Sequence, residues 1–120
     1  MKEIVTVIRP GKDRETKRAL AKIGCFACTS VRVFGRGRQR GLKYGGSPGS
    51  GAGAAEGIVM KYLPKKMLSL VVDERQTRSV VETLIRVNQT GQYGDGKIFV
   101  LEAKETYRIR TGEKGEAAIQ

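Results

Sequence analysis

The amino-acid sequence predicts a single α+β domain whose strands and helices follow the order β-α-β-β-α-β. Short runs rich in valine and isoleucine alternate with two longer segments in which apolar residues recur at helical spacing. Glycine and proline mark most of the boundaries between these segments. At 120 residues, the chain is long enough for one two-layer core and too short for a separate catalytic domain.

The first half of the chain is expected to form a strand, a helix and a second strand. Residues 3–8 are a continuous apolar run and predict a central strand. Asp13 is placed to N-cap the helix that follows, and Gly24 stands where a C′ glycine ends a helix. Residues 29–34 predict the second strand. Residues 35–57 are mainly glycine, serine, alanine and basic residues, so a long loop is expected there.

The second half has a similar layout, although no residue-level repeat is evident. Residues 58–63 and 67–72 predict strand structure, with a bulge or an edge position at Pro64 between them. Asp73 and Gln76 resemble a capping box, and the apolar residues that follow at helical spacing predict the second helix.

Two further segments follow the second helix. Residues 97–102 predict the last strong strand, and residues 106–110 predict a short additional one. This element order implies a ferredoxin-like sandwich, in which an antiparallel four-stranded sheet carries both helices on one face. The strands at residues 3–8 and 67–72 are apolar on both sides. We therefore expect the open face of the sheet to pack against other subunits of an oligomer.

Composition restricts the classes of function. The formal net charge of +11 and the isoelectric point near 10.1 favour an anionic ligand or partner. The chain has no histidine, and Cys25 and Cys28 lack a second pair of ligands, so a structural zinc site is nearly excluded and both are interpreted as buried or half-buried free thiols. No constellation of nucleophile and base is evident, which disfavours an enzyme. Because no run of about 18 apolar residues and no signal peptide is present, we expect a soluble cytoplasmic protein without membrane insertion.

The most informative segment is residues 90–100, Thr-Gly-Gln-Tyr-Gly-Asp-Gly-Lys-Ile-Phe-Val. Its glycines allow positive φ angles that turn backbone N–H groups toward an anion, and Lys97 at the end of the loop can contact a phosphate oxygen. The spacing matches neither a Walker A loop nor a dinucleotide-binding fingerprint. The alternative is a tight hairpin turn, for which Asp-Gly ahead of a strand is a common signal.

Four segments, in the same order, resemble motifs of the PII signal-transduction proteins, which are cytosolic sensors of nitrogen, carbon and energy status. Residues 90–100 are similar to the B-loop signature of that family, and residues 108–113 resemble its C-terminal loop signature. Residues 35–41 resemble the base of its T-loop, and residues 62–65 match the strand that returns from that loop. The resemblance covers nearly the whole chain.

The resemblance implies one domain over residues 1–120, with a flexible T-loop at about 36–60, a B-loop at about 90–97 and a C-terminal loop at about 108–120. It also implies a homotrimer, or a mixed trimer with a paralogue. ATP and ADP would compete for the three clefts between the subunits.

By this resemblance, the nucleotide phosphates contact the glycine loop and Arg38, while Arg108 and Arg110 reach the phosphates and the ribose from the adjacent subunit. Arginine suits this task because its planar guanidinium binds phosphate oxygens in bidentate fashion. Thr29 and the backbone around Val71 would flank the adenine. The nucleotide-binding residues implied in this way are Thr29, Gly35, Gly37, Arg38, Gln39, Val71, Gly94, Asp95, Gly96, Lys97, Arg108 and Arg110.

Members of the family also bind 2-oxoglutarate through a Mg²⁺ ion that it shares with ATP. Gln39 matches the residue whose side-chain oxygen joins the coordination of that ion, which prefers hard oxygen ligands. Lys65 matches the lysine that pairs with a carboxylate of 2-oxoglutarate, Arg9 lies where a second cation would act, and Gly41 belongs to the same site. The T-loop residues expected to contact a target protein are Arg40, Leu42, Lys43 and Tyr44.

The T-loop is longer and richer in glycine than the common form, and Tyr44 lies in a different context from the tyrosine that is nucleotidylylated in common members. In these respects the chain resembles the nitrogenase-associated branch of the family. The resemblance implies a non-enzymatic regulator that binds dinitrogenase and inhibits it when 2-oxoglutarate is low. One alternative is a regulator of an ammonium transporter or another nitrogen-assimilation target. An alternative of another class is a basic RNA-binding module, although we expect no nucleic-acid partner.

Overall fold

The structure is a computed structural model of the chain, and it describes residues 1–37 and 62–120. The expected T-loop therefore lies outside the described residues from residue 38 onward, as does most of the strand expected at 58–63. The main elements are β1 (Lys2–Ile8), α1 (Asp13–Lys22), β2 (Thr29–Gly35), β3 (Leu63–Val72), α3 (Thr77–Asn88) and β4 (Lys97–Glu102). Short 3₁₀ helices lie at Pro10–Lys12, Glu74–Gln76 and Gly115–Ala118.

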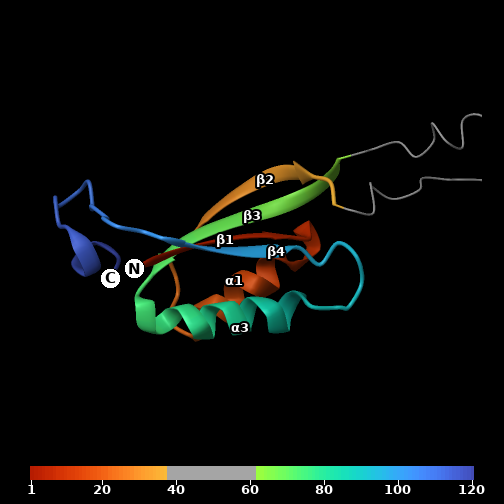
Figure 1. The fold of residues 1–120 in the computed structure, drawn as a ribbon, viewed down its shortest axis with the longest axis horizontal. Helices are drawn as coiled ribbons and strands as arrows, with labels where there is room; N and C mark the ends of the chain where they lie inside the picture. Colours follow the sequence, from red (N-terminus) through yellow and green to blue (C-terminus); the bar gives the residue numbers. More distant parts are fainter. Residues whose placement is uncertain (38–61) are drawn as a thin grey trace, which may run out of the picture.

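The four strands form one antiparallel sheet in the order β2-β3-β1-β4. Helices α1 and α3 lie side by side on one face of it (Figure 1). This is the ferredoxin-like sandwich that the element order predicts. The antiparallel register places Gly35, the end of β1 and the start of β4 at one end of the sheet. The chain segment that joins α3 to β4 therefore lies at that end (Figure 1).

The core lies between the helices and the sheet, and alternation along the strands builds it. In β1 the side chains of Ile4, Thr6 and Ile8 are buried, whereas the residues between them are half-buried on the opposite face. Burying an aliphatic side chain of this size contributes roughly 1.5–3 kcal/mol. The buried apolar residues that form the main cluster are Ile4, Leu20, Leu70, Val72, Val80 and Leu84.

The open face of the sheet is also largely apolar. Val5 pairs with Phe99, and Val31 pairs with Met67. Phe99 is 51% exposed, which is high for a large apolar side chain in a strand. The two central strands, β1 and β3, carry no aromatic residue, so they lack the base-stacking platform of an RNA-recognition module.

The helix starts differ from the expectation. Asp13 is the first residue of α1 and makes no N-cap, because the 3₁₀ turn at Pro10–Lys12 leads directly into the helix and places Lys12 at the N-cap. The Asp13 carboxylate instead accepts from Lys17 Nζ at 3.1 Å. Gly24, with φ of 86°, does occupy the expected C′ position.

The capping box expected before the second helix is also wrong. Asp73 caps the preceding 3₁₀ turn, where its carboxylate accepts the Arg75 N–H at 2.8 Å. Gln76 occupies the N-cap of α3 and makes no side-chain bond there. The sequence signal for a cap was therefore real, but an extra turn separates it from the helix.

Strand β3 runs without interruption through Pro64, so of the two alternatives for this residue the bulge is wrong and the edge position is confirmed. Pro64 pairs with Phe34, and the register continues unbroken to the next residues. The pairing of β1 with β3 ends at Lys66. Pro64 therefore has no strand neighbour on that side, and its missing N–H costs the sheet little.

Three further expectations can be compared with the described residues. The short strand expected at residues 106–110 is wrong, because only a single bridge between Tyr107 and Lys114 forms there. Cys25 is half-buried, and burial raises the pKa of its thiol, whereas Cys28 is exposed rather than buried. Within residues 1–37 and 62–120, no helix is long and apolar enough to cross a membrane.

Candidate phosphate-binding site

The glycine-rich segment forms a tight loop between α3 and β4, because its glycines have backbone angles that other residues avoid. The φ angles are 84° at Gly91, 99° at Gly94 and 108° at Gly96. At Gly96 a Cβ atom would lie 1.8 Å from the carbonyl oxygen of Val7, so no side chain fits there. The loop thus passes directly against the end of β1, which a hairpin turn alone would not require.

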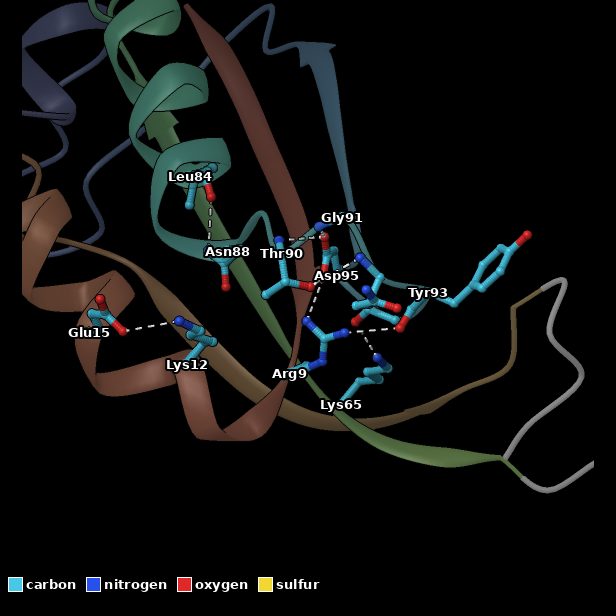
Figure 2. Close-up of polar contacts among 12 residues, drawn as sticks. Arg9, Lys12, Glu15, Lys65, Leu84, Asn88, Thr90, Gly91, Tyr93 and Asp95 are labelled. Atoms are coloured by element: carbon cyan, nitrogen blue, oxygen red, sulfur yellow. Dashed lines mark hydrogen bonds and ion pairs between the residues drawn. The ribbon is translucent and has the colours of Figure 1, made fainter. Parts of the chain in front are cut away.

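Asp95 holds the loop together from the inside. Its carboxylate accepts the N–H of Thr90 at 2.7 Å, the N–H of Gly91 at 3.0 Å and the hydroxyl of Thr90 at 2.5 Å. It also accepts from Arg9 Nη1 at 2.6 Å (Figure 2). The bonds from Thr90, followed by that from Arg9, hold the pKa of Asp95 well below its usual range. Asp95, which the family resemblance assigned to nucleotide binding, has its carboxylate engaged within the loop.

Two cations from outside the loop contact it (Figure 2). Arg9, just beyond the end of β1, donates from Nη2 to the carbonyl of Tyr93 at 2.9 Å. Lys65, on β3, donates from Nζ to the carbonyl of Gly94 at 2.8 Å. Burial, and then the nearby Arg9 charge, lower the pKa of Lys65. The structure therefore brings together the two cations that the resemblance assigned to 2-oxoglutarate, and both are bonded to the loop.

A cavity of about 560 Å³ lies beside this loop. Val7, Lys65 and Lys97 line it, and all three belong to the open face of the sheet because of the strand register. Phe99 adds an apolar wall. The cavity lies on the face of the sheet opposite to α1 and α3, so a second subunit on that face would close it. The candidate residues that the cavity brings together are Gly35, Gly37, Lys65, Gly94, Asp95, Gly96 and Lys97.

Other candidate residues lie at the opposite end of the protomer. Thr29 pairs with Ser69, far along β2 from the cavity, and Val71 lies at the same end of β3. Arg108 and Arg110 follow the far end of β4 (Figure 1). One chain therefore does not place these residues in its own cavity. The remaining candidates lie outside the described residues: Arg38, Gln39, Arg40, Gly41, Leu42, Lys43 and Tyr44.

Sequence reasoning missed the internal bonding of the loop. Thr90 supplies two of the bonds to Asp95, and the carbonyl of Tyr93 accepts from Arg9, yet neither residue was assigned a role. The sequence held one indication of this bonding, because Asp95 stands between two glycines in the loop. Its carboxylate cannot easily bind a ligand and accept hydrogen bonds from the loop at the same time. Only the location of Arg9 decides between these roles, and that depends on tertiary structure.

The sequence profile of the family described as nitrogen regulatory protein P-II matches residues 1–113. The chain belongs to the P-II family. It is 48% identical over 124 residues to the nitrogen fixation nifHD1 region GlnB-like protein 2 of Methanosarcina barkeri, with 100% of both chains covered. It is 42% identical over 126 residues to the nifHD region GlnB-like protein 2 of Methanothermococcus thermolithotrophicus, with 99% of this chain and 98% of the relative covered.

The fold of a solved P-II protein agrees with this assignment. The crystal structure of Arabidopsis thaliana PII bound to citrate superposes with a TM-score of 0.76 at 31% sequence identity, over 99% of this chain and 89% of that one. P-II proteins are regulatory, are generally trimers, and generally bind ATP or ADP and 2-oxoglutarate. The expected grouping with the nitrogenase-associated branch is confirmed by the nifHD-region relatives.

Proposed function

We propose that this protein is a non-enzymatic sensor of ATP, ADP and 2-oxoglutarate that binds nitrogenase and inhibits it when 2-oxoglutarate is low. The loop at residues 90–97 is the observation that carries the proposal. Gly94, Gly96 and Lys97 of this loop line one cavity on the open face of the sheet, together with Lys65 of β3. The hydrogen bonds to Asp95 hold the loop in this shape. This arrangement suits the phosphates of a nucleotide.

The residues of the cavity fit a nucleotide in charge and shape. Lys97 and the backbone of Gly94 and Gly96 would hold phosphate oxygens. Gly35 and Gly37 also line the cavity, and without side chains they would let the nucleotide come close to the backbone. A second subunit on the open face would supply the other wall. The residues proposed for that wall are Thr29, Val71, Arg108 and Arg110, with Arg38 from the T-loop base.

The cavity is suited to binding rather than to hydrolysis. Among the described residues that line it, the carboxylate is that of Asp95. Four hydrogen bonds engage that carboxylate, and its depressed pKa makes it a poor general base.

The effector 2-oxoglutarate would bind beside the phosphates. Lys65 would pair with one of its carboxylates, with Arg9 as a second cation. Lys65 donates to the Gly94 carbonyl, so the effector would have to replace that bond. Mg²⁺ would be held by ligand oxygens and by Gln39, which with Gly41 lies outside the described residues. The ligand would thus sit where the T-loop leaves and rejoins the sheet, and its binding would change how that loop meets a partner.

Nitrogenase is proposed as the target because the relatives carry the names of nitrogen-fixation regions. The T-loop residues proposed to contact it are Arg40, Leu42, Lys43 and Tyr44. We propose that the protein works in the cytoplasm, as a homotrimer or with a paralogue.

A pull-down from nitrogen-fixing cells tests the proposal. The tagged protein is expected to recover dinitrogenase without effector and to lose it when Mg-ATP and 2-oxoglutarate are added together. Lys65→Ala and Gln39→Ala should keep dinitrogenase bound in the presence of both ligands, because they remove proposed contacts to the effector. Recovery of an ammonium transporter instead would contradict the nitrogenase proposal. If the same amount of dinitrogenase is recovered with and without both ligands, the proposed sensor function is contradicted.

A further inference from the structure

The segment that follows β4 folds back on itself and bonds one of the arginines proposed to bind phosphate. Arg108 donates from Nη1 to the Glu113 carboxylate at 3.0 Å. Its Nη2 donates to the carbonyl of Ala117 at 3.1 Å and to the main-chain oxygen of Gln120 at 2.5 Å. All three acceptors lie in residues 113–120, which we call the tail.

The backbone holds the tail in place for these bonds. The N–H of Arg108 donates to the carbonyl of Glu113 at 2.8 Å, and the N–H of Gly112 donates to the carbonyl of Arg108 at 2.7 Å. The N–H of Gly115 donates to the carbonyl of Thr106 at 2.9 Å. The chain therefore turns tightly here, and the turn brings the tail to the Arg108 side chain, which is only 26% exposed.

Arg110, two residues further along, behaves differently. It is exposed, and among the described residues its side chain makes no hydrogen bond or ion pair. The two arginines that the nucleotide site requires are thus in different states in the same protomer. Arg110 is free to meet a ligand, whereas the guanidinium of Arg108 already contacts three oxygen atoms.

We propose that the tail is a built-in competitor of the nucleotide, which holds Arg108 and must release it before Arg108 can bind phosphate in the neighbouring subunit's cavity. This inference rests on the proposed function, because it takes Arg108 as a phosphate ligand. The tail presents the kind of atoms that a phosphate presents, a carboxylate oxygen and two further oxygens. Nη2 donates to two oxygens and Nη1 to a third, so while the tail is in place neither edge of the guanidinium can bind a phosphate in bidentate fashion.

The competition sets the apparent affinity for the nucleotide. When only a fraction of the molecules has the conformation that binds the ligand, the apparent affinity is reduced in proportion to that fraction. The Glu113 side chain is 42% exposed, and ion pairs of this exposure are weak enough to be reversible. Removing the Glu113 charge is therefore expected to tighten ATP binding by about two- to fivefold.

Calorimetric titration of the full chain with ATP tests the inference, with Glu113→Gln compared with Glu116→Gln. Glu116 lies in the same tail, and its carboxylate has no hydrogen-bond or ion-pair partner among the described residues. The control therefore removes the same charge without freeing Arg108. We expect Glu113→Gln to bind ATP about two- to fivefold more tightly than the wild type, and Glu116→Gln to match the wild type.

The outcomes separate this inference from the proposed function. If the wild type binds ATP and Glu113→Gln binds it no more tightly than Glu116→Gln, the tail does not compete and the inference fails alone. Weaker binding by Glu113→Gln would show that Glu113 positions Arg108 for the ligand, which also overturns the inference. If neither the wild type nor any variant binds ATP, the proposed function and the inference both fail.

Discussion

Replacing Gly96 by alanine is expected to disrupt the phosphate loop, lower the free energy of unfolding by at least about 2 kcal/mol and abolish ATP binding. A Cβ atom at this residue would lie 1.8 Å from the carbonyl oxygen of Val7 and 2.9 Å from its carbonyl carbon. These are backbone atoms of the sheet, so the loop has to move instead. The φ angle of 108° adds strain for any residue with a side chain. Urea denaturation and ATP titration measure the two effects.

Gly91→Ala is the matched control for this prediction. Gly91 also has a positive φ, of 84°, but a Cβ atom there meets nothing within 4 Å. The control should lose stability through backbone strain alone and should still bind ATP. If Gly96→Ala were as stable as Gly91→Ala and bound ATP equally well, the close contact between the loop and β1 would not hold in solution.

Replacing Asp95 by asparagine is expected to weaken ATP binding by about tenfold or more, although Asp95 is not proposed to touch the nucleotide. The substitution replaces one acceptor oxygen by an NH₂ group that faces the loop N–H groups or Arg9. The bonds from Thr90, Gly91 and Arg9 are then weakened together. The loop loses the geometry that aims its N–H groups into the cavity.

The same substitution predicts a change in the pH dependence of stability. The pKa of Asp95 is depressed in the folded protein, so its stabilising contribution is complete above the unfolded-state pKa of about 3.9. That contribution is lost as pH falls through the lower folded-state pKa. The difference in unfolding free energy between the wild type and Asp95→Asn should therefore be constant near neutral pH and should shrink in acid.

Asp73→Asn is the control for the Asp95 prediction. The hydrogen bonds from Arg75 lower the pKa of Asp73 to about 2, so its contribution to stability is lost over a similar acidic range. Asp73 lies at the N-cap of the 3₁₀ turn that precedes α3, and it does not line the loop cavity. We expect Asp73→Asn to lose stability with unchanged ATP affinity. If Asp95→Asn and Asp73→Asn bind ATP with equal affinity, the hydrogen bonds to the Asp95 carboxylate do not shape the nucleotide site.

Sequence patterns predicted the layers of this fold because the pattern and the structure have the same cause. Alternation along β1 and helical spacing in α3 both follow from burying one side of an element. The start of α1 was harder to predict, because Asp13 is an equally good residue for the cap and for the first turn. Pro64 left two alternatives open, a bulge or an edge position, because only the length of β1 decides whether a strand neighbour lies beside it.

The sequence predicted the candidate site about as completely as it predicted the fold. The glycines and Lys97 identified the loop, because their conformations and charge are local properties. The bond between Arg9 and Asp95 was not predictable, because the two residues lie 86 positions apart in the chain. The bonds of Arg108 depend on how the C-terminal segment turns back on itself. The C-terminal segment satisfies its backbone groups within a turn rather than in a strand, and periodicity does not distinguish these outcomes.

In the proposed trimer, each nucleotide site combines the loop of one subunit with the arginines of the next. Mixed trimers of two variants test it most directly, with Lys97→Ala removing the loop cation and Arg110→Ala removing the neighbour's cation. Both side chains are exposed and neither makes an ion pair among the described residues, so both variants should fold. Each variant alone is expected to lose most of its ATP binding.

In a trimer that contains both variants, one interface pairs an intact loop with an intact arginine. Calorimetry on trimers purified through two different tags should therefore recover binding of one ATP per mixed trimer, with wild-type affinity. Mixed trimers that bind no ATP, or Arg110→Ala trimers that bind it as the wild type does, would contradict a site shared between subunits.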